Sequence, residues 1–322
     1  MPDPLRGQRV AANWEAVVGT TPQDAINNDY WLLNQLSKGD GFLGLSGGDF
    51  ITQPLEYALN TTVASYTDTD PILTTRVDVF DRCEYQWREY AGTYVISELE
   101  EDRNAGVGQV FDLRKAKLTN LQNSMRATLN TDLHGDGTGN SGKATDGLAN
   151  LVASNPLIGS PGGINRANFP FWRNQQVLGT KTNNPYDNLR AAMRSCYNLC
   201  SNGIADDHPT FAITTRTIFE AYEGLLIANE RFVDKSNGDG AFKNEVLKFK
   251  GAMISYDVAA VAGELRFLNQ KYLKLAYKTG SWMKMRPAIQ PANQTIDIVL
   301  VRTMCDLIAI NPRRLGVVTV IT

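Results

Sequence analysis

Residues 107–137, VGQVFDLRKAKLTNLQNSMRATLNTDLHGDG, contain the strongest helical pattern in the chain. Apolar residues recur at helical spacing on one stripe, with polar and basic residues elsewhere on the helix surface. The stripe consists of Val107, Phe111, Leu118, Leu121, Met125, Leu129 and Leu133. About 27 residues at about 1.5 Å each make a rod of roughly 40 Å. Gly135 follows directly after His134, and because glycine commonly ends helices, we predict that the rod stops there.

The stretch before this helix, from Phe50 to about Asn104, changes to the alternation typical of strands. Its alternating apolar and aromatic residues are Val77, Val79, Phe80, Tyr85, Trp87, Tyr94 and Ile96. The pattern predicts a long two-stranded excursion. Because an isolated two-stranded ribbon is only marginally stable in water, we expect this one to lie on another surface.

The remaining pattern is that of an α+β protein. A glycine-rich, irregular arm with one short helix at about 22–36 precedes the excursion. A second helix begins at Asn184-Pro185, a cap followed by proline, and ends at Gly203. A third helix is predicted at 217–228. Strands are predicted at 210–214, 246–256, 271–276, 296–301, 307–310 and 315–321.

Length and composition restrict the classes of protein that remain. The 322 residues exceed one typical domain of roughly 100–200 residues, so we expect two lobes or one domain with a long excursion. With 43% hydrophobic and 20% charged residues the chain is expected to fold. Its net charge of -2 argues against a sequence-reading DNA-binding protein. No apolar run approaches the roughly 20 residues of a membrane span, and residues 1–10, MPDPLRGQRV, lack the apolar core of a signal peptide, so we expect cytosolic synthesis and no membrane partner.

Three local motifs resemble catalytic or ion-binding loops but lack the required context. Residues 44–48, GLSGG, match a nucleophile elbow, yet strand-like residues follow where a helix is needed. Residues 137–144 resemble a phosphate-binding loop, but Ala144 replaces the hydroxyl residue that would bind Mg²⁺. Residues 234–245 have the length of a calcium loop with unsuitable residues at its central positions. We expect no catalytic residue, no cofactor and no metal site.

The cysteines and histidines also indicate structure rather than chemistry. Cys83, Cys196, Cys200 and Cys305 are scattered without a CxxC pair, and they are predicted to be reduced core residues. The chain has only two histidines, which cannot build a three-histidine zinc site.

The order of these elements resembles that of tailed-bacteriophage major capsid proteins with the Hong Kong 97-type fold. Local segments carry the same resemblance. DGLANLV at 146–152, INR at 164–166 and FWRN at 171–174 are similar to the stretch after the long "spine" helix of many such coats. FLNQKYL at 267–273 and NPRRLGV at 311–317 are similar to the closing half of the family. The resemblance extends over nearly the whole chain.

The resemblance implies a division of the chain into four parts. They are an N-terminal arm at 1–46, an extended loop at 47–104, a peripheral domain with the spine helix at 105–202 and 300–322, and an axial domain at 203–299.

The function implied by the resemblance is mechanical. Copies of the chain would assemble as pentamers and hexamers into an icosahedral head shell around phage double-stranded DNA, in the host bacterial cytoplasm and then the virion. A separate scaffolding protein, a portal and a decoration protein are the further expected partners, with only non-specific contact to the packaged DNA. Two alternatives remain open: an encapsulin-like cellular compartment, and a soluble enzyme of an unrelated α+β fold.

Two groups of residues are expected at the interface between subunits. The loop aromatics Phe80, Tyr85, Trp87, Tyr90 and Tyr94 carry more apolar area than a protruding ribbon should expose. Residues 52–103 contain eleven acidic residues against four arginines, whereas the start of the spine helix is basic. Arg114, Lys115 and Lys117 are therefore expected to pair with the acidic loop; a solvated charged surface is the alternative.

The loop also lacks the residue that would join subunits covalently. In the founding member of the family, a lysine of the extended loop attacks an asparagine of a neighbour, which requires an amine nucleophile. No lysine lies between Lys38 and Lys115 here, and a guanidinium stays protonated and cannot replace it. We predict a non-covalent shell.

Overall fold

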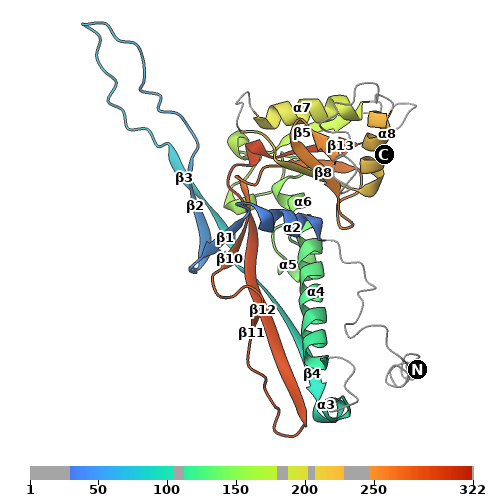
Figure 1. Ribbon diagram of the computed structural model, residues 1–322. Helices are drawn as coiled ribbons and strands as arrows, with labels where there is room; N and C mark the ends of the chain where they lie inside the picture. Colours follow the sequence, from blue (N-terminus) through green and yellow to red (C-terminus); the bar gives the residue numbers. More distant parts are fainter. Residues whose placement is uncertain (1–29, 105–111, 180–187, 202–206, 228–246, 321–322) are drawn as a thin grey trace.

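The computed structural model describes residues 30–104, 112–179, 188–201, 207–227 and 247–320. Three parts are visible in Figure 1: a hairpin that projects from one side, a long arm built of a sheet and a helix, and a rounded lobe that contains the second sheet. The predicted α+β class is confirmed.

The arm is a five-stranded sheet organised around one strand, β12 (Ile296–Ala309). β12 pairs antiparallel with three strands, and a fourth strand, β1, pairs parallel with β10. These strands are β1 (Phe42–Leu45), β4 (Arg88–Ser97), β10 (Leu273–Lys278) and β11 (Lys284–Met285). The predicted strands at 296–301 and 307–310 are thus one continuous strand, because the residues between them also pair with β4 and β10.

The predicted rod is α4 (Leu113–His134), which lies along β4 in the arm (Figure 1). The Asp112 side chain accepts a hydrogen bond from the Lys115 backbone N–H at 3.0 Å and caps the helix. A Cβ at Gly92 of β4 would lie 2.7 Å from Cδ1 of Leu121, so the absence of a side chain there lets the helix approach the sheet. The described helix confirms the prediction from residue 113 onward; residues 107–111 lie outside the described part of the chain.

The lobe contains a six-stranded sheet in the order β5-β13-β9-β6-β8-β7. Its strands are β5 (Gln175–Gly179), β6 (Phe211–Thr214), β7 (Leu247–Phe249), β8 (Ala252–Tyr256), β9 (Glu264–Leu268) and β13 (Gly316–Val320). Two helices, α7 (Leu189–Ser201) and α8 (Arg216–Ile227), share a hydrophobic core with this sheet. The single strand predicted at 246–256 is a β7–β8 hairpin, whose turn places Lys250 at φ 48° and Gly251 at φ 95°.

Short helices complete the described elements. They are α2 (Trp31–Lys38), α3 (Glu98–Arg103), α5 (Gly139–Gly142), α6 (Leu148–Leu151) and the 3₁₀ turns η2 (Pro161–Gly163), η3 (Pro170–Trp172) and η5 (Pro312–Arg314). The predicted early helix at 22–36 is α2 in its later half, and residues 22–29 lie outside the described part. The helix predicted to begin at Asn184 is described from Leu189.

One buried arginine explains why the segments DGLANLV, INR and FWRN occur together. The Arg166 side chain is fully buried, and its guanidinium donates to the carbonyls of Asn150 and Leu151 at the end of α6. Arg173 in turn donates to the Arg166 carbonyl at 2.7 Å, and Asn174 donates to the Ala153 carbonyl at 2.9 Å. Burial lowers the pKa of Arg166 to about 10, so the side chain remains charged at neutral pH. The three segments form one hydrogen-bonded unit after the spine helix.

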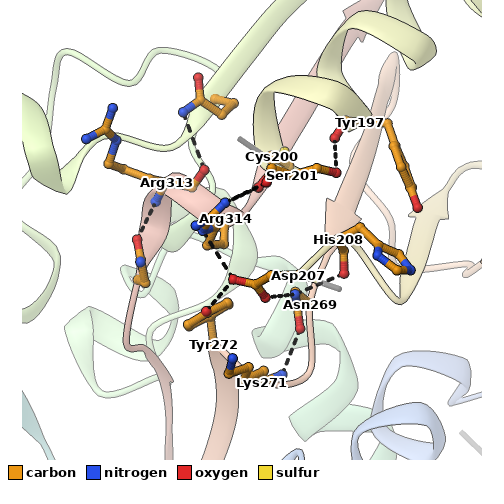
Figure 2. A network of polar contacts seen from close by, with 12 residues as sticks. Tyr197, Cys200, Ser201, Asp207, His208, Asn269, Lys271, Tyr272, Arg313 and Arg314 are labelled. Carbon is orange, nitrogen blue, oxygen red and sulfur yellow. Dashed lines mark hydrogen bonds and ion pairs between the residues drawn. The ribbon is translucent and has the colours of Figure 1, made fainter. Parts of the chain in front are cut away.

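A polar network joins the arm to the lobe (Figure 2). The Asp207 carboxylate accepts hydrogen bonds from the Tyr272 hydroxyl at 2.6 Å and from Asn269 Nδ2 at 3.3 Å, and it lies 3.4 Å from Arg314 Nε. Arg314 also donates to the Ser201 carbonyl at 2.8 Å, at the C-terminal end of α7, where a cation is favoured by the helix dipole. The network therefore ties α7, the β9–β10 turn and η5 to one carboxylate.

The sheets divide the chain differently from the predicted boundaries. Strand β5 and helix α7, which fall in the predicted peripheral segment 105–202, belong to the sheet and core of the lobe. Strand β10 and the start of β12, which fall in the predicted axial segment 203–299, belong to the arm. The boundaries differ because the chain passes between the two sheets several times, and no composition change marks these crossings.

The local motifs and cysteines have structural roles. The serine of GLSGG follows β1 and precedes β2, and residues 139–142 form a four-residue turn with left-handed Asn140 and Ser141. The calcium-like stretch 234–245 lies outside the described residues. All four cysteines are free and buried, as predicted, and a Cβ at Gly316 would lie 2.5 Å from Cys200 Sγ and 2.6 Å from Cys196 Sγ. Among the described helices, none has the length and apolar character needed to cross a membrane.

Candidate intersubunit surface

The projecting hairpin is formed by β2 (Phe50–Glu56) and β3 (Phe80–Gln86), which pair antiparallel from Phe50–Gln86 to Glu56–Phe80. Residues 57–79 connect them without regular secondary structure, and Figure 1 shows this connection extending far from the rest of the chain. The predicted two-stranded excursion is therefore present, but it ends at Gln86. The following residues, 88–97, form β4 and pair with β12 in the arm.

Large apolar side chains are exposed along the hairpin. The most exposed are Leu59 at 85%, Val63 at 82%, Phe80 at 73% and Ile72 at 71%. Phe50, Tyr57, Tyr66 and Leu73 are exposed to a smaller extent. Tyr57 stacks on the ring of Phe171 at a centroid distance of 5.5 Å, whereas Leu59, Val63, Ile72 and Phe80 leave most of their apolar surface uncovered by the described chain. Exposed apolar surface of this kind marks an interaction site.

The structure separates the five predicted aromatic residues into two groups. Phe80 is exposed, as expected for an interface residue. Tyr85, by contrast, is only 1% exposed and packs in the core of its own chain, so the expectation that it projects into solvent is wrong. Its hydroxyl donates to the Ala309 carbonyl at 2.9 Å. Strand β3 enters the body of the protein at its C-terminal end, which explains the difference between the two residues.

The other three aromatic residues are partly buried. Trp87 and Tyr90 pack against the core that contains α4 and β12. The Tyr90 hydroxyl donates to Asp132 Oδ2 at 2.8 Å, and burial raises the pKa of Tyr90 well above its ordinary value. Tyr94 lies on β4, paired with Val299 of β12. These residues belong to the arm, so any contact of theirs with a second subunit would be made there and not on the hairpin.

The basic residues at the start of α4 do pair with acidic residues, but within one chain. Arg114 Nε lies 2.5 Å from Glu101 Oε1, and Arg114 Nη2 lies 2.8 Å from Asp297 Oδ2. Lys117 Nζ lies 2.6 Å from Glu100 Oε2. The hydrogen bond from Arg114 lowers the pKa of the Glu101 carboxyl. Both acidic partners from α3 fall in the acidic stretch 52–103 singled out from the sequence.

Lys115 differs from its two neighbours. Its side chain is exposed and makes no ion pair among the described residues. Of the three predicted basic residues, Lys115 is therefore the one whose charge is available to another molecule.

The arm contains a buried carboxylate, Asp306, close to the partly buried Asp146. Asp306 of β12 accepts from the Thr145 hydroxyl at 2.6 Å and from the Asp146 N–H at 3.0 Å. Burial, with the nearby Asp146 charge adding to it, raises the pKa of Asp306 to about 7. Across the described ranges, no three His, Cys, Asp or Glu side chains come together in a way that could hold a metal ion. The described features are therefore those of a binding surface, the exposed apolar hairpin, carried by a five-stranded sheet and the long helix α4.

The apolar residues at the tip of the hairpin are not predicted by the sequence pattern. Leu59, Val63, Ile72 and Leu73 lie among Thr, Asp and Asn residues without any period of two or 3.6. The available signal was Ile72-Leu73 following Pro71, an apolar pair in a polar segment that has no helix or strand of its own to bury it.

Comparison with known proteins gives a match by structure alone. No protein-family model matches the chain, and no curated protein matches it by sequence. The capsid of cyanophage A-1(L) superposes with a TM-score of 0.69 at 14% identity, covering 94% of this chain and 96% of that one. The capsid of a native GTA particle superposes at 0.64 with 11% identity over the full length of both chains. The holo-SrpI encapsulin of Synechococcus elongatus PCC 7942 superposes at 0.61 with 13% identity, covering 97% and 94%.

These similarities define a class of fold. Shell subunits of phage capsids and of an encapsulin share the architecture of this chain over nearly their whole lengths. The chain has the Hong Kong 97-type capsid fold.

Proposed function

We propose that this chain is a major capsid protein that self-assembles into the icosahedral head shell enclosing the double-stranded DNA of a tailed bacteriophage. The observation that carries the proposal is the projecting hairpin with its exposed Leu59, Val63, Ile72 and Phe80, on a chain whose fold matches capsid subunits from end to end. An isolated soluble protein gains nothing from such a projection, whereas a subunit covered by its neighbours buries it.

The parts of the chain take separate roles in this proposal. The hairpin is the extended loop, with its tip at residues 57–79. The arm with α4 and β12 is the peripheral domain, and the lobe with α7 and α8 is the axial domain, around which pentamers and hexamers meet. Residues 1–46 are the N-terminal segment that the family resemblance calls the N-terminal arm; its described part contains α2 and β1.

Further partners and the location follow from the same role. The shell assembles in the cytoplasm of a host bacterium, around a separate scaffolding protein and a portal, and is later part of the virion. A decoration protein is the remaining candidate partner. The contact with packaged DNA is non-specific, which fits the net charge of -2.

The alternative function is an encapsulin-like cellular compartment, and the superposition with the SrpI encapsulin supports it. Negative-stain microscopy of the expressed full-length chain tests both forms of the proposal, because either should give closed shells. Particles purified from the native source then distinguish them. Nuclease-protected double-stranded DNA inside the particles supports the phage head, whereas a packaged enzyme without a genome supports the compartment. A chain that stays monomeric at all concentrations would contradict both.

A further inference from the structure

One hollow of the lobe is lined by positive charge. A cavity of about 620 Å³ lies between α7, α8 and the β7–β8 hairpin. Its charged lining residues are Arg190 and Arg194 of α7 and Lys248 and Lys250 of the hairpin. No carboxylate is among its described lining residues. The hollow is on the lobe, apart from the hairpin and the arm described above.

Three of the four cations have no partner in the described part of the chain. Lys250 Nζ donates to Asn198 Oδ1 at 2.8 Å, but Arg190, Arg194 and Lys248 make no ion pair or side-chain hydrogen bond there. Arg190 and Arg194 lie one helical turn apart, a spacing at which like charges repel. Lys248 and Lys250 are both exposed and lie two residues apart. The fold thus brings together cations that oppose one another unless an anion joins them.

The uncharged part of the lining favours one kind of anion. Its uncharged lining residues are Ala191, Tyr222, Leu226 and Phe249; Tyr222 is 2% exposed and Phe249 is 8% exposed, so the apolar surface comes mainly from Ala191 and Leu226. The Tyr222 hydroxyl already donates to the Lys248 carbonyl at 3.2 Å. Among the described lining residues no aromatic side chain is open to anchor a peptide, so the four cations are the main attraction that the hollow offers to a polyanion.

The backbone spacing of the residues that carry these charges matches the phosphate repeat of a nucleic acid strand. Residues two apart in a strand are roughly 6.6 Å apart, and residues four apart in a helix rise by roughly 6 Å. One strand of B-DNA carries a phosphate about every 3.4 Å along its axis, so two steps span roughly 6.8 Å. Arginine forks bind phosphate oxygens in pairs, and lysines bind them as point charges.

We propose that this cationic hollow, formed by Arg190, Arg194, Lys248 and Lys250, binds the phosphate backbone of nucleic acid. The inference rests on the proposed function and deepens it, because it assigns the contact with packaged DNA to one face of the lobe. That face, bearing α7, α8 and β7, then points to the interior of the shell.

The test measures binding by the unassembled full-length chain, so it does not depend on shell formation. A fluorescent 20-base-pair DNA duplex is titrated with the parent chain and with the triple variant Arg190→Gln, Arg194→Gln, Lys248→Gln over a salt series. The matched control is Lys143→Gln, Lys284→Gln, Arg313→Gln, which removes the same charge from exposed positions elsewhere. Circular dichroism and thermal unfolding verify that both variants fold.

We expect the hollow variant to bind DNA at least tenfold more weakly than the control variant. Its slope of log affinity against log salt should be shallower by about 2 to 3, as for the loss of three phosphate contacts. Equal affinity and slope in the two variants would overturn the inference. So would polyglutamate that competes for the hollow as well as DNA does, because the site would then take an acidic protein. A folded chain that binds DNA through the hollow but never forms shells would contradict the proposed function alone.

Discussion

Phe80 and Tyr85 lie five residues apart on strand β3, and their replacement by alanine should have opposite consequences. Phe80 is 73% exposed on the hairpin, whereas Tyr85 is 1% exposed in the core of its own chain. A phenylalanine side chain has roughly 150–250 Å² to bury, so roughly 110–180 Å² of Phe80 is available to a neighbouring subunit. At about 25 cal/mol per Å² this contact contributes about 2.8–4.5 kcal/mol per subunit when wholly covered.

Phe80→Ala should therefore leave the free energy of unfolding of the unassembled chain within about 0.5 kcal/mol of the parent value, as for other exposed positions. The concentration at which shells form should rise at least tenfold, since about 1.4 kcal/mol corresponds to a factor of ten. Denaturant unfolding measures the first quantity, and light scattering with negative-stain microscopy over a dilution series measures the second.

Tyr85→Ala is the matched control on the same strand. It should lower the free energy of unfolding by about 3–5 kcal/mol through lost packing, with a further cost for the unpaired Ala309 carbonyl. A folded Phe80→Ala chain that assembles at the parent concentration would refute the assignment of the hairpin as a contact between subunits.

Three further predictions follow from the same features. Tyr57 and Val79 are hydrogen-bonded across the hairpin at 3.0 Å, so an Asn-Gly turn can replace residues 58–78 between them. The shortened chain should keep the thermal stability of the parent but form no closed shell. Normal particles in the microscope would argue against the hairpin's role. Because burial raises the pKa of Asp306 to about 7, the folded chain holds a proton that the unfolded chain releases near pH 4, so this residue makes stability fall as pH rises from about 4 to about 7. Across that range the free energy of unfolding of the parent chain should fall by on the order of 1.4 kcal/mol per pH unit through this residue, and Asp306→Asn should abolish that part of the fall. Identical pH profiles for the two chains would contradict the burial argument. Mature particles boiled in detergent under reducing conditions should give one band near 35.5 kDa, whereas a ladder of covalent oligomers would disprove the non-covalent shell.

The sequence pattern predicted elements with a regular apolar stripe, such as α4, and short apolar runs, such as the fully buried β6, but it missed strand β9. The spine helix is recognisable because its apolar stripe alternates with exposed polar positions. Strand β9, ELRFL, contains two charged residues, and only the structure shows that Arg266 is buried there beside its ion-pair partner Glu264. The unit built around Arg166 could be recognised by resemblance, but only the structure shows the hydrogen bonds that hold its segments together.

The candidate surfaces depended on information that a sequence pattern does not contain. Alternation identified β3 and β4 as strands but not their partners, and the partner decides whether an aromatic residue faces solvent or the core of its own chain. The basic residues of the hollow were visible as pairs, Arg190 with Arg194 and Lys248 with Lys250, yet more than fifty residues separate the two pairs. Only the order of strands in the lobe places β7 beside α7 and α8.

Strand β12 also determines how the subunit carries mechanical load. It runs the length of the arm, pairs with ten residues of β4, and continues through η5 into β13 inside the sheet of the lobe. Tension along this strand acts in shear, so the ladder's hydrogen bonds share it and cannot be broken one after another as in unzipping. Because the same covalent segment enters both sheets, outward pressure on the lobe is transmitted to the arm as a pull along its stiffest direction. A container wall assembled from such subunits would resist stretching more strongly than it resists bending.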